Sequence, residues 1–145
     1  SKTMIVFLTQ NSRPFIYDTA PPPVVAAAAL EALSILQESR GALTKQLQEN
    51  INLFRKVAKS AFIPLTQSTS PIQPILIGDA RAALGIEKEL KKFKIYARAI
   101  RPPTVPKGTS RLRITLSSQH TEAQILDLIN ALKEVLPNGN KAQSE

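Results

Sequence analysis

Two arginines spaced two residues apart, Arg111 and Arg113, are well suited to bind an anion. They alternate with Leu112, Ile114 and Leu116. This period of two predicts a strand with one apolar face and one arginine face. A guanidinium held on a strand can donate two parallel hydrogen bonds to a carboxylate or phosphate. The pattern therefore predicts an anion site, with a solvated surface arginine as the alternative interpretation.

A proline-rich loop leads into this strand. It begins at Arg101 and contains Pro102, Pro103 and Pro106, whose rings fix φ at about −65° and restrict the backbone. Gly108 permits the turn into the strand. Loop and strand together have the composition of an anion-binding site.

Three segments resemble the α-oxoamine synthases, a family of pyridoxal-phosphate enzymes that condense an amino acid with an acyl thioester and release CO2. They are Phe15–Pro22 (FIYDTAPP), Pro71–Asp79 (PIQPILIGD) and Ile100–Pro106 (IRPPTVP), the last followed by Arg-Leu-Arg. They occur in the family's order across essentially the whole chain, although Asp18 stands where serine is usual. The last segment is closest to the biotin-pathway branch, which joins alanine to a pimeloyl thioester. The 5-aminolevulinate and 2-amino-3-ketobutyrate branches differ before the Val-Pro.

The resemblance implies roles for five residues. Arg113 would bind the carboxylate of the amino acid, and Thr104 would contact the substrate. Arg101 would also bind substrate or would only anchor the loop. Thr19 would reach the cofactor phosphate of the neighbouring subunit, with Tyr17 packed beside it. The alternatives are local: Thr104 can simply favour extended geometry, and Thr19 can be a helix-entry residue.

The cofactor implied by the resemblance is pyridoxal 5'-phosphate, held in the family by a Gly-flanked lysine, an aspartate and a histidine that precede the matched segments. Neither Lys2 nor Lys107 has that setting. We therefore expect a C-terminal piece of a longer enzyme, with no catalytic residue of its own and no activity alone. The implied partners are alanine, an acyl thioester of coenzyme A or a carrier protein, and a second subunit in a homodimer. A non-catalytic interaction or dimerisation domain of the same fold is the alternative.

Composition excludes several other classes. The chain has no cysteine and one histidine, His120, so disulfides and Cys- or His-based metal sites are not expected; His120, just before a helix, is expected to be structural. The net charge is +8, yet no aromatic residues alternate with basic ones as in nucleic-acid binding. A basic surface would instead steer a polyanionic thioester. No apolar run reaches the ~20 residues that span a bilayer, and a cytoplasmic location is expected.

The expected fold class is α/β, in two-layer α+β form, with a small, mostly antiparallel sheet backed by helices, like the C-terminal domain of fold-type-I pyridoxal-phosphate transferases. We expect residues 1–60 to form an N-terminal segment and long helix that link to a missing large domain, 61–137 a small domain, and 138–145 a polar tail. Residues 15–36 are too apolar for one small sheet to cover, so self-association is expected.

The hydrophobic periodicity and cap residues predict the individual elements. Met4–Leu8 is left open between helix and strand, and residues 62–70 are expected to be loop with a possible short strand. The remaining expected elements are a helix from Val24, kinked or loosened at Gly41 and continuing to Ala58, an edge or bulged strand Ile72–Ile77, a helix from Asp79 to Phe93, strands Ile95–Arg101 and Arg111–Ser117, and a helix from a Thr121–Gln124 capping box to Pro137.

Overall fold

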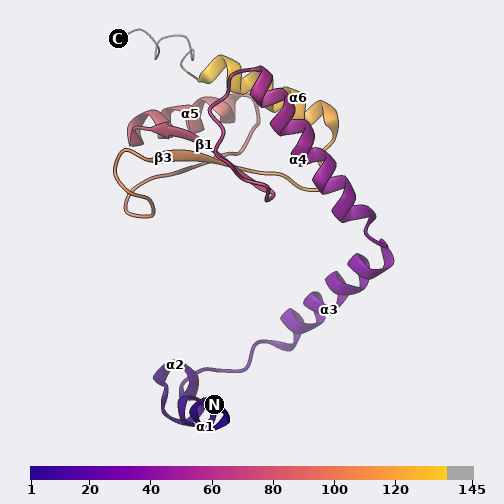
Figure 1. Ribbon diagram of the computed structural model, residues 1–145, viewed down its shortest axis with the longest axis vertical. Coiled ribbons are helices and arrows are strands. Elements are labelled where there is room, and N and C mark those ends of the chain that lie inside the picture. The colour runs from indigo at the N-terminus through magenta and orange to yellow at the C-terminus, as the bar shows by residue number, and fades with distance from the viewer. Residues whose placement is uncertain (137–145) are drawn as a thin grey trace. The chain divides into compact units, whose positions relative to one another are not determined.

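The computed structural model describes residues 1–136, which divide into two compact units, Ser1–Arg40 and the part from Gly41 onward. Each unit is described by itself (Figure 1). The predicted roles of residues 1–60 and 61–137 in a longer protein stay predictions.

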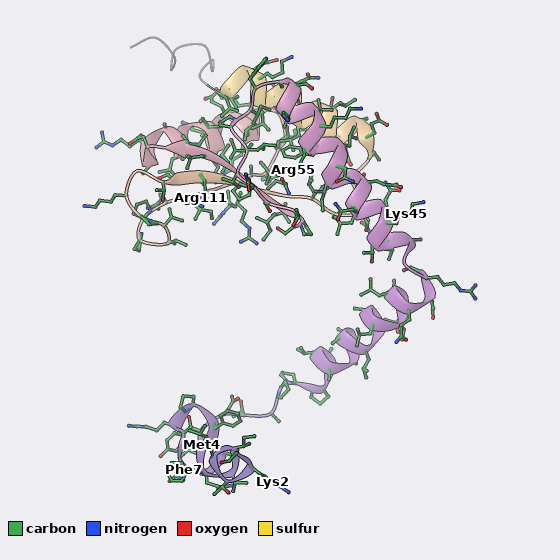
Figure 2. The ribbon with its side chains drawn as sticks, in the orientation of Figure 1. Lys2, Met4, Phe7, Lys45, Arg55 and Arg111 are labelled. Carbon is green, nitrogen blue, oxygen red and sulfur yellow. The ribbon has the colours of Figure 1, made fainter. Side chains whose placement is uncertain are left out.

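The first unit contains three helices and no buried residue. They are α1 (Lys2–Asn11), α2 (Arg13–Ile16) and α3 (Pro23–Glu38). Helix α1 resolves the open interpretation of Met4–Leu8, and the Ser1 hydroxyl accepts a hydrogen bond from the Met4 N–H at 3.3 Å. Large apolar side chains along all three helices are exposed, among them Met4 and Phe7 (Figure 2). This unit therefore has no hydrophobic core of its own.

The second unit is a three-stranded antiparallel sheet with helices packed on one face (Figure 1). Its elements are α4 (Ala42–Ser60), β1 (Ile72–Gly78), α5 (Ala80–Lys92), β2 (Arg98–Ile100), β3 (Ser110–Thr115) and α6 (Glu122–Val135). The strand order is β1-β3-β2. The fully buried side chains come from helices and strands alike: Phe54, Ile75, Leu90, Leu112, Ile125 and Leu132. The predicted small antiparallel sheet backed by helices is confirmed.

The predicted helix from Val24 to Ala58 is interrupted at Gly41, where a kink or loosening was expected, and forms two separate helices. Two successive residues, Arg40 with φ 47° and Gly41 with φ 85°, adopt left-handed backbone conformations. This conformation cannot be part of a right-handed helix. Helix α3 therefore ends at Glu38, and α4 begins after Gly41 as a separate helix.

Strand β1 lies at an edge of the sheet, as Pro74 predicts. Its outer side is covered by the preceding loop, because the Leu76 N–H donates to the Pro64 carbonyl and the Thr66 N–H donates to the Pro74 carbonyl. Leu65 forms an isolated bridge to Ile75, the only part of the possible short strand that is realised within the described residues.

The strand predicted for Ile95–Arg101 is shorter than expected. Lys94 has φ 60°, and the Ile95 N–H still donates to the Leu90 carbonyl, so the chain is turning out of α5 at these residues. Strand β2 consequently begins at Arg98.

Both predicted helix caps are confirmed. The Asp79 carboxylate accepts from the Ala82 N–H at 2.8 Å, and Thr121 and Gln124 form the reciprocal capping box of α6. The predicted stop at Pro137 and the polar tail lie outside the described residues.

Candidate functional site

The arginines of β3 lie on the sheet face that points away from the helices. Leu112, Ile114 and Leu116 on the opposite face are 0%, 4% and 4% exposed and belong to the core. Arg113 is exposed and Arg111 is half-buried. The predicted apolar and arginine faces of this strand are therefore confirmed.

The two arginines differ in what they can bind. The Nε atom of Arg111 donates to the Thr109 carbonyl at 3.0 Å, which ties this side chain to the turn before β3 (Figure 2). Arg113 forms no ion pair or hydrogen bond through its side chain within residues 1–136. Arg113 is therefore the better placed of the two to donate both hydrogen bonds to an external carboxylate.

The proline-rich loop begins at the end of β2, beside the arginine strand. Ile100, the last residue of β2, lies opposite Arg111 in the sheet, and Arg101 follows it directly. The Thr104 N–H donates to the Arg101 carbonyl at 3.1 Å, closing a turn that contains the cis Pro102–Pro103 peptide. A depression of about 220 Å³ is lined by residues 99–104. Arg101 and Thr104 are both exposed on this loop, next to the strand of Arg113.

The carboxylate of Glu87 on α5 accepts a backbone hydrogen bond from strand β2. The Ala99 N–H donates to Oε2 of Glu87 at 2.8 Å, and Lys91 pairs with Oε1 at 3.3 Å. The backbone hydrogen bond from Ala99 is the main cause that lowers the pKa of Glu87, and Lys91 and Arg98 add to it, against a raising effect of burial. Glu87 is thus a structural anion whose two oxygens already have partners.

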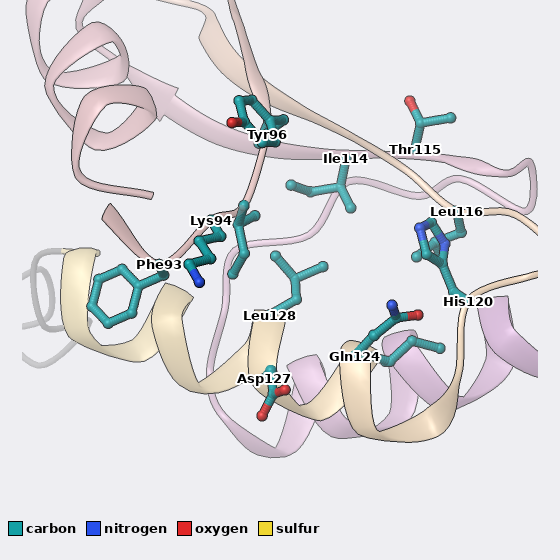
Figure 3. Close-up of a pocket in the computed structure, with 13 residues that line it drawn as sticks. Phe93, Lys94, Tyr96, Ile114, Thr115, Leu116, His120, Gln124, Asp127 and Leu128 are labelled. Carbon is teal, nitrogen blue, oxygen red and sulfur yellow. The ribbon is translucent and has the colours of Figure 1, made fainter. Parts of the chain in front are cut away.

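A larger cleft of about 410 Å³ lies on the helix side of the sheet (Figure 3). Its walls include Ile114 of β3 and Leu128 of α6, with Lys94, Tyr96 and Asp127 among the polar lining residues. None of the five predicted site residues lines it.

His120 also lines this cleft, but its contacts are structural. Its Nδ1 atom accepts from the Ser117 N–H at 3.0 Å, and its carbonyl accepts from the Asn50 side chain at 2.8 Å. Asn50 is 3% exposed and also donates to the Ser117 carbonyl. These bonds fix the turn before α6, in agreement with the structural role expected for this histidine.

Thr19 and Tyr17, the predicted cofactor residues, belong to the first unit. The Thr19 N–H donates to the Asp18 carboxylate at 2.9 Å, and the Arg13 guanidinium lies 5.9 Å from the centre of the Tyr17 ring. Tyr17 is 72% exposed. The predicted contact of these residues with a cofactor stays a prediction.

The described part of the chain contains neither a candidate metal site nor a candidate membrane-spanning helix. Among residues 1–136, no three His, Asp or Glu side chains are arranged to hold a metal ion. Within the same part of the chain, no helix combines the length and apolarity needed to cross a membrane.

Comparison with known proteins identifies the family. The model of the aminotransferase class I and II family matches residues 1–132, and the chain belongs to this family. Among curated relatives, the 8-amino-7-oxononanoate synthase of Pseudomonas entomophila (strain L48) is 42% identical over 144 residues, 99% of this chain and 37% of the relative. The enzyme of the same name from Cellvibrio japonicus (strain Ueda107) is 46% identical over 136 residues, 94% of this chain and 34% of the relative.

Solved structures agree with this assignment. The 8-amino-7-oxononanoate synthase from Francisella tularensis has a TM-score of 0.73 and 30% identity, covering 92% of this chain and 39% of that one. A serine palmitoyltransferase from S. paucimobilis with a bound PLP–myriocin aldimine has a TM-score of 0.77 and 25% identity, covering 88% and 32%. The predicted resemblance and fold class are confirmed, and the chain spans about a third of the length of these relatives.

Proposed function

We propose that this chain is the C-terminal part of a pyridoxal-phosphate-dependent acyltransferase of the 8-amino-7-oxononanoate synthase type. The enzyme would condense L-alanine with a pimeloyl thioester, with loss of CO2, in biotin synthesis. The observation that supports this best is Arg113, which lies exposed beside the Arg101–Thr104 loop and has no side-chain partner within residues 1–136, in a chain 42% identical to synthases of that name.

In this proposal Arg113 binds the amino-acid carboxylate. Its planar guanidinium can donate two parallel hydrogen bonds, which fix the orientation of the carboxylate as well as its position. Holding the carboxylate sets which bond at Cα is aligned for cleavage. Thr104 contacts the substrate from the adjacent loop, and Arg101 holds the loop or extends the anion site.

The cofactor of the proposed enzyme is pyridoxal 5'-phosphate, which supplies an electron sink for the negative charge that develops at Cα. The residues present fit its phosphate group, because Thr19 is exposed and its hydroxyl forms no hydrogen bond within residues 1–136. Thr19 would donate to the phosphate of the neighbouring subunit's cofactor, with Tyr17 beside it. The Schiff-base lysine would come from another part of the protein, and this chain alone is expected to be inactive.

The remaining parts of the proposal concern partners and location. The acyl thioester of coenzyme A or of a carrier protein is polyanionic, and the net charge of +8 favours its approach. The proposed enzyme is a cytoplasmic homodimer whose active sites use residues of both subunits.

Steady-state kinetics of the full-length protein test the carboxylate role. Arg113→Ala should raise the KM for alanine and lower kcat/KM by an amount equivalent to roughly 2–4 kcal/mol, as for loss of a desolvated charged partner. Arg113→Lys should restore function only in part, because an ammonium lacks the planar fork. Lys107→Ala, an exposed cation of the same loop, is the control. Unchanged kinetics of Arg113→Ala would refute this role and direct attention to Arg111 and Arg101.

A screen of alanine, glycine and serine against several acyl thioesters tests the substrates. Preferred turnover of alanine with a pimeloyl thioester is expected. Preferred turnover of glycine or serine would instead indicate another α-oxoamine synthase, and no turnover with any pair would support a non-catalytic domain.

A further inference from the structure

We infer that Arg98 is a second anion-binding residue of this site and that it binds an anionic group of the acyl donor; the inference rests on the proposed function. Arg98 lies directly opposite Arg113 in the antiparallel pairing of β2 with β3. Directly paired residues of neighbouring strands point to the same face. Arg98 therefore shares the outer face with Arg113, and both side chains are exposed.

Two arginines placed opposite each other repel, and like charges in this position destabilise a sheet. No carboxylate among residues 1–136 offsets them by an ion pair. Glu87 is near enough for the charge of Arg98 to lower its pKa, but its two oxygens already have partners in the Ala99 N–H and Lys91. Within residues 1–136 neither guanidinium group has an ion-pair partner, which favours the binding of anions from outside.

The number of charges points to the second substrate. Alanine has one carboxylate, and a single guanidinium satisfies it through two hydrogen bonds. With Arg113 on that group, Arg98 remains for a second anion, and the acyl donor carries several. They are the free carboxylate at the far end of a dicarboxylic acyl chain and the phosphates of the thioester carrier. Ile100, half-buried on the same face of β2, adds apolar surface next to Arg98 that suits methylene groups.

The inference predicts that the two arginines affect different substrates. In the full-length protein, Arg98→Ala should raise the KM for the acyl donor about tenfold or more and leave the KM for alanine unchanged. Arg98→Lys should recover part of the loss, because a positive charge remains. Arg113→Ala should show the reverse pattern. Arg81→Ala, an exposed arginine of α5, is the matched control and should change neither value.

Modified donors distinguish the two anions. If Arg98 binds the distal carboxylate, a donor in which that carboxylate is a methyl ester should have the same KM with Arg98→Ala as with the unmodified protein. If Arg98 binds the carrier phosphates, a pantetheine thioester, which lacks them, should have the same KM with Arg98→Ala as with the unmodified protein. A donor KM unaffected by Arg98→Ala, or an effect confined to the KM for alanine, would overturn the inference.

Equilibrium binding gives a readout that does not depend on turnover. Calorimetry of the full-length protein with free coenzyme A and with pimelate should show about tenfold weaker binding of one of them to Arg98→Ala. Equal affinity of both proteins for both ligands would refute the role of Arg98. Failure of the proposed function would look different: no turnover of any amino acid and thioester, or an unchanged alanine KM for Arg113→Ala.

Discussion

The backbone N–H of Ala99 donates to Oε2 of Glu87 at 2.8 Å, so a side chain of α5 provides the acceptor for an outward N–H at the edge of the sheet. Strand β2 is an edge strand, and its outward N–H would otherwise need water or another partner. The Glu87 side chain is only 13% exposed. This bond fixes β2, and with it the loop that carries Arg101 and Thr104, against α5.

Removing this carboxylate should destabilise the chain. Glu87→Ala leaves the Ala99 N–H without its acceptor and should lower the free energy of unfolding by about 1–2 kcal/mol. Glu87→Gln keeps an acceptor oxygen and should cost less. Urea denaturation measures both values, and equal stability of all three proteins would show that water replaces the carboxylate without loss.

The same bond predicts a pH dependence. Because the folded state lowers the pKa of Glu87 from its ordinary 4.5, its contribution to stability is complete above that value and is lost as the pH falls through the lower, folded-state pKa. The difference in unfolding free energy between the unmodified chain and Glu87→Gln should therefore be constant from pH 7 to about 5 and shrink in more acidic solution. A difference that grows on acidification would contradict the assigned direction.

Besides Arg40, two non-glycine residues take the left-handed conformation just after a helix. Phe62, with φ 54° and 87% exposed, follows α4, and Lys94, with φ 60°, follows α5. In both places the next N–H donates back into the helix, from Ile63 to Ala58 and from Ile95 to Leu90, as in a Schellman motif.

Glycine adopts this conformation without a steric penalty. Phe62→Gly and Lys94→Gly should therefore each stabilise the fold by about 1 kcal/mol. Ser60→Gly, within the last turn of α4, is the control and should destabilise by about 0.5–1 kcal/mol. Thermal unfolding should show a higher Tm for Phe62→Gly and Lys94→Gly and a lower Tm for Ser60→Gly. Destabilisation by Phe62→Gly would show that the Phe62 ring makes a contact that outweighs the strain.

A buried polar network holds the loop before β1. Gln73 is 1% exposed; its amide donates to the carbonyls of Ser68 and Ser70, and its oxygen accepts from Arg55 at 2.8 Å. Gln73→Leu would leave these groups unpaired and should cost about 2–3 kcal/mol.

The exposed Gln48 of α4 provides the matched control, since Gln48→Leu should change the stability by less than about 0.5 kcal/mol. Chemical denaturation compares the two variants. Similar small effects of both would indicate that the loop rearranges to satisfy its own carbonyls.

The apolar first unit predicts self-association. Helices α1, α2 and α3 contain no buried residue, and large exposed apolar patches mark interaction surfaces. Light scattering of the chain at several concentrations should show an apparent mass that rises with concentration. The part from Gly41 onward alone should associate less, and a strictly monomeric full chain at high micromolar concentration would refute the prediction.

Local sequence signals predicted much of the second unit. The Asp79 cap, the Thr121–Gln124 capping box and the two faces of β3 each depend on residues within one turn or one strand, so the sequence contains all that determines them. Gly41 indicated a kink or loosening but not the full break before α4, because Arg40 as well as Gly41 takes the left-handed conformation, which an arginine does not signal.

The site was predictable only in part, for a related reason. Arg101, Thr104 and Arg113 follow from the motif and its alternation. Arg98 was not singled out, because its position opposite Arg113 depends on the pairing register of two strands. Extending the alternation of residues 95–101 with a trial register would have shown that both arginines share a face.

The strand order β1-β3-β2 also has a consequence for the time course of synthesis. Strands β1 and β2 each pair only with β3, so both leave the ribosome before their pairing partner has been made. The sheet can close only after Ser110–Thr115 has emerged, and α6, which completes the apolar core, follows later still. Until then the apolar faces of α4 and β1 stay uncovered, and transiently exposed apolar surface of this kind promotes aggregation and is what chaperones bind.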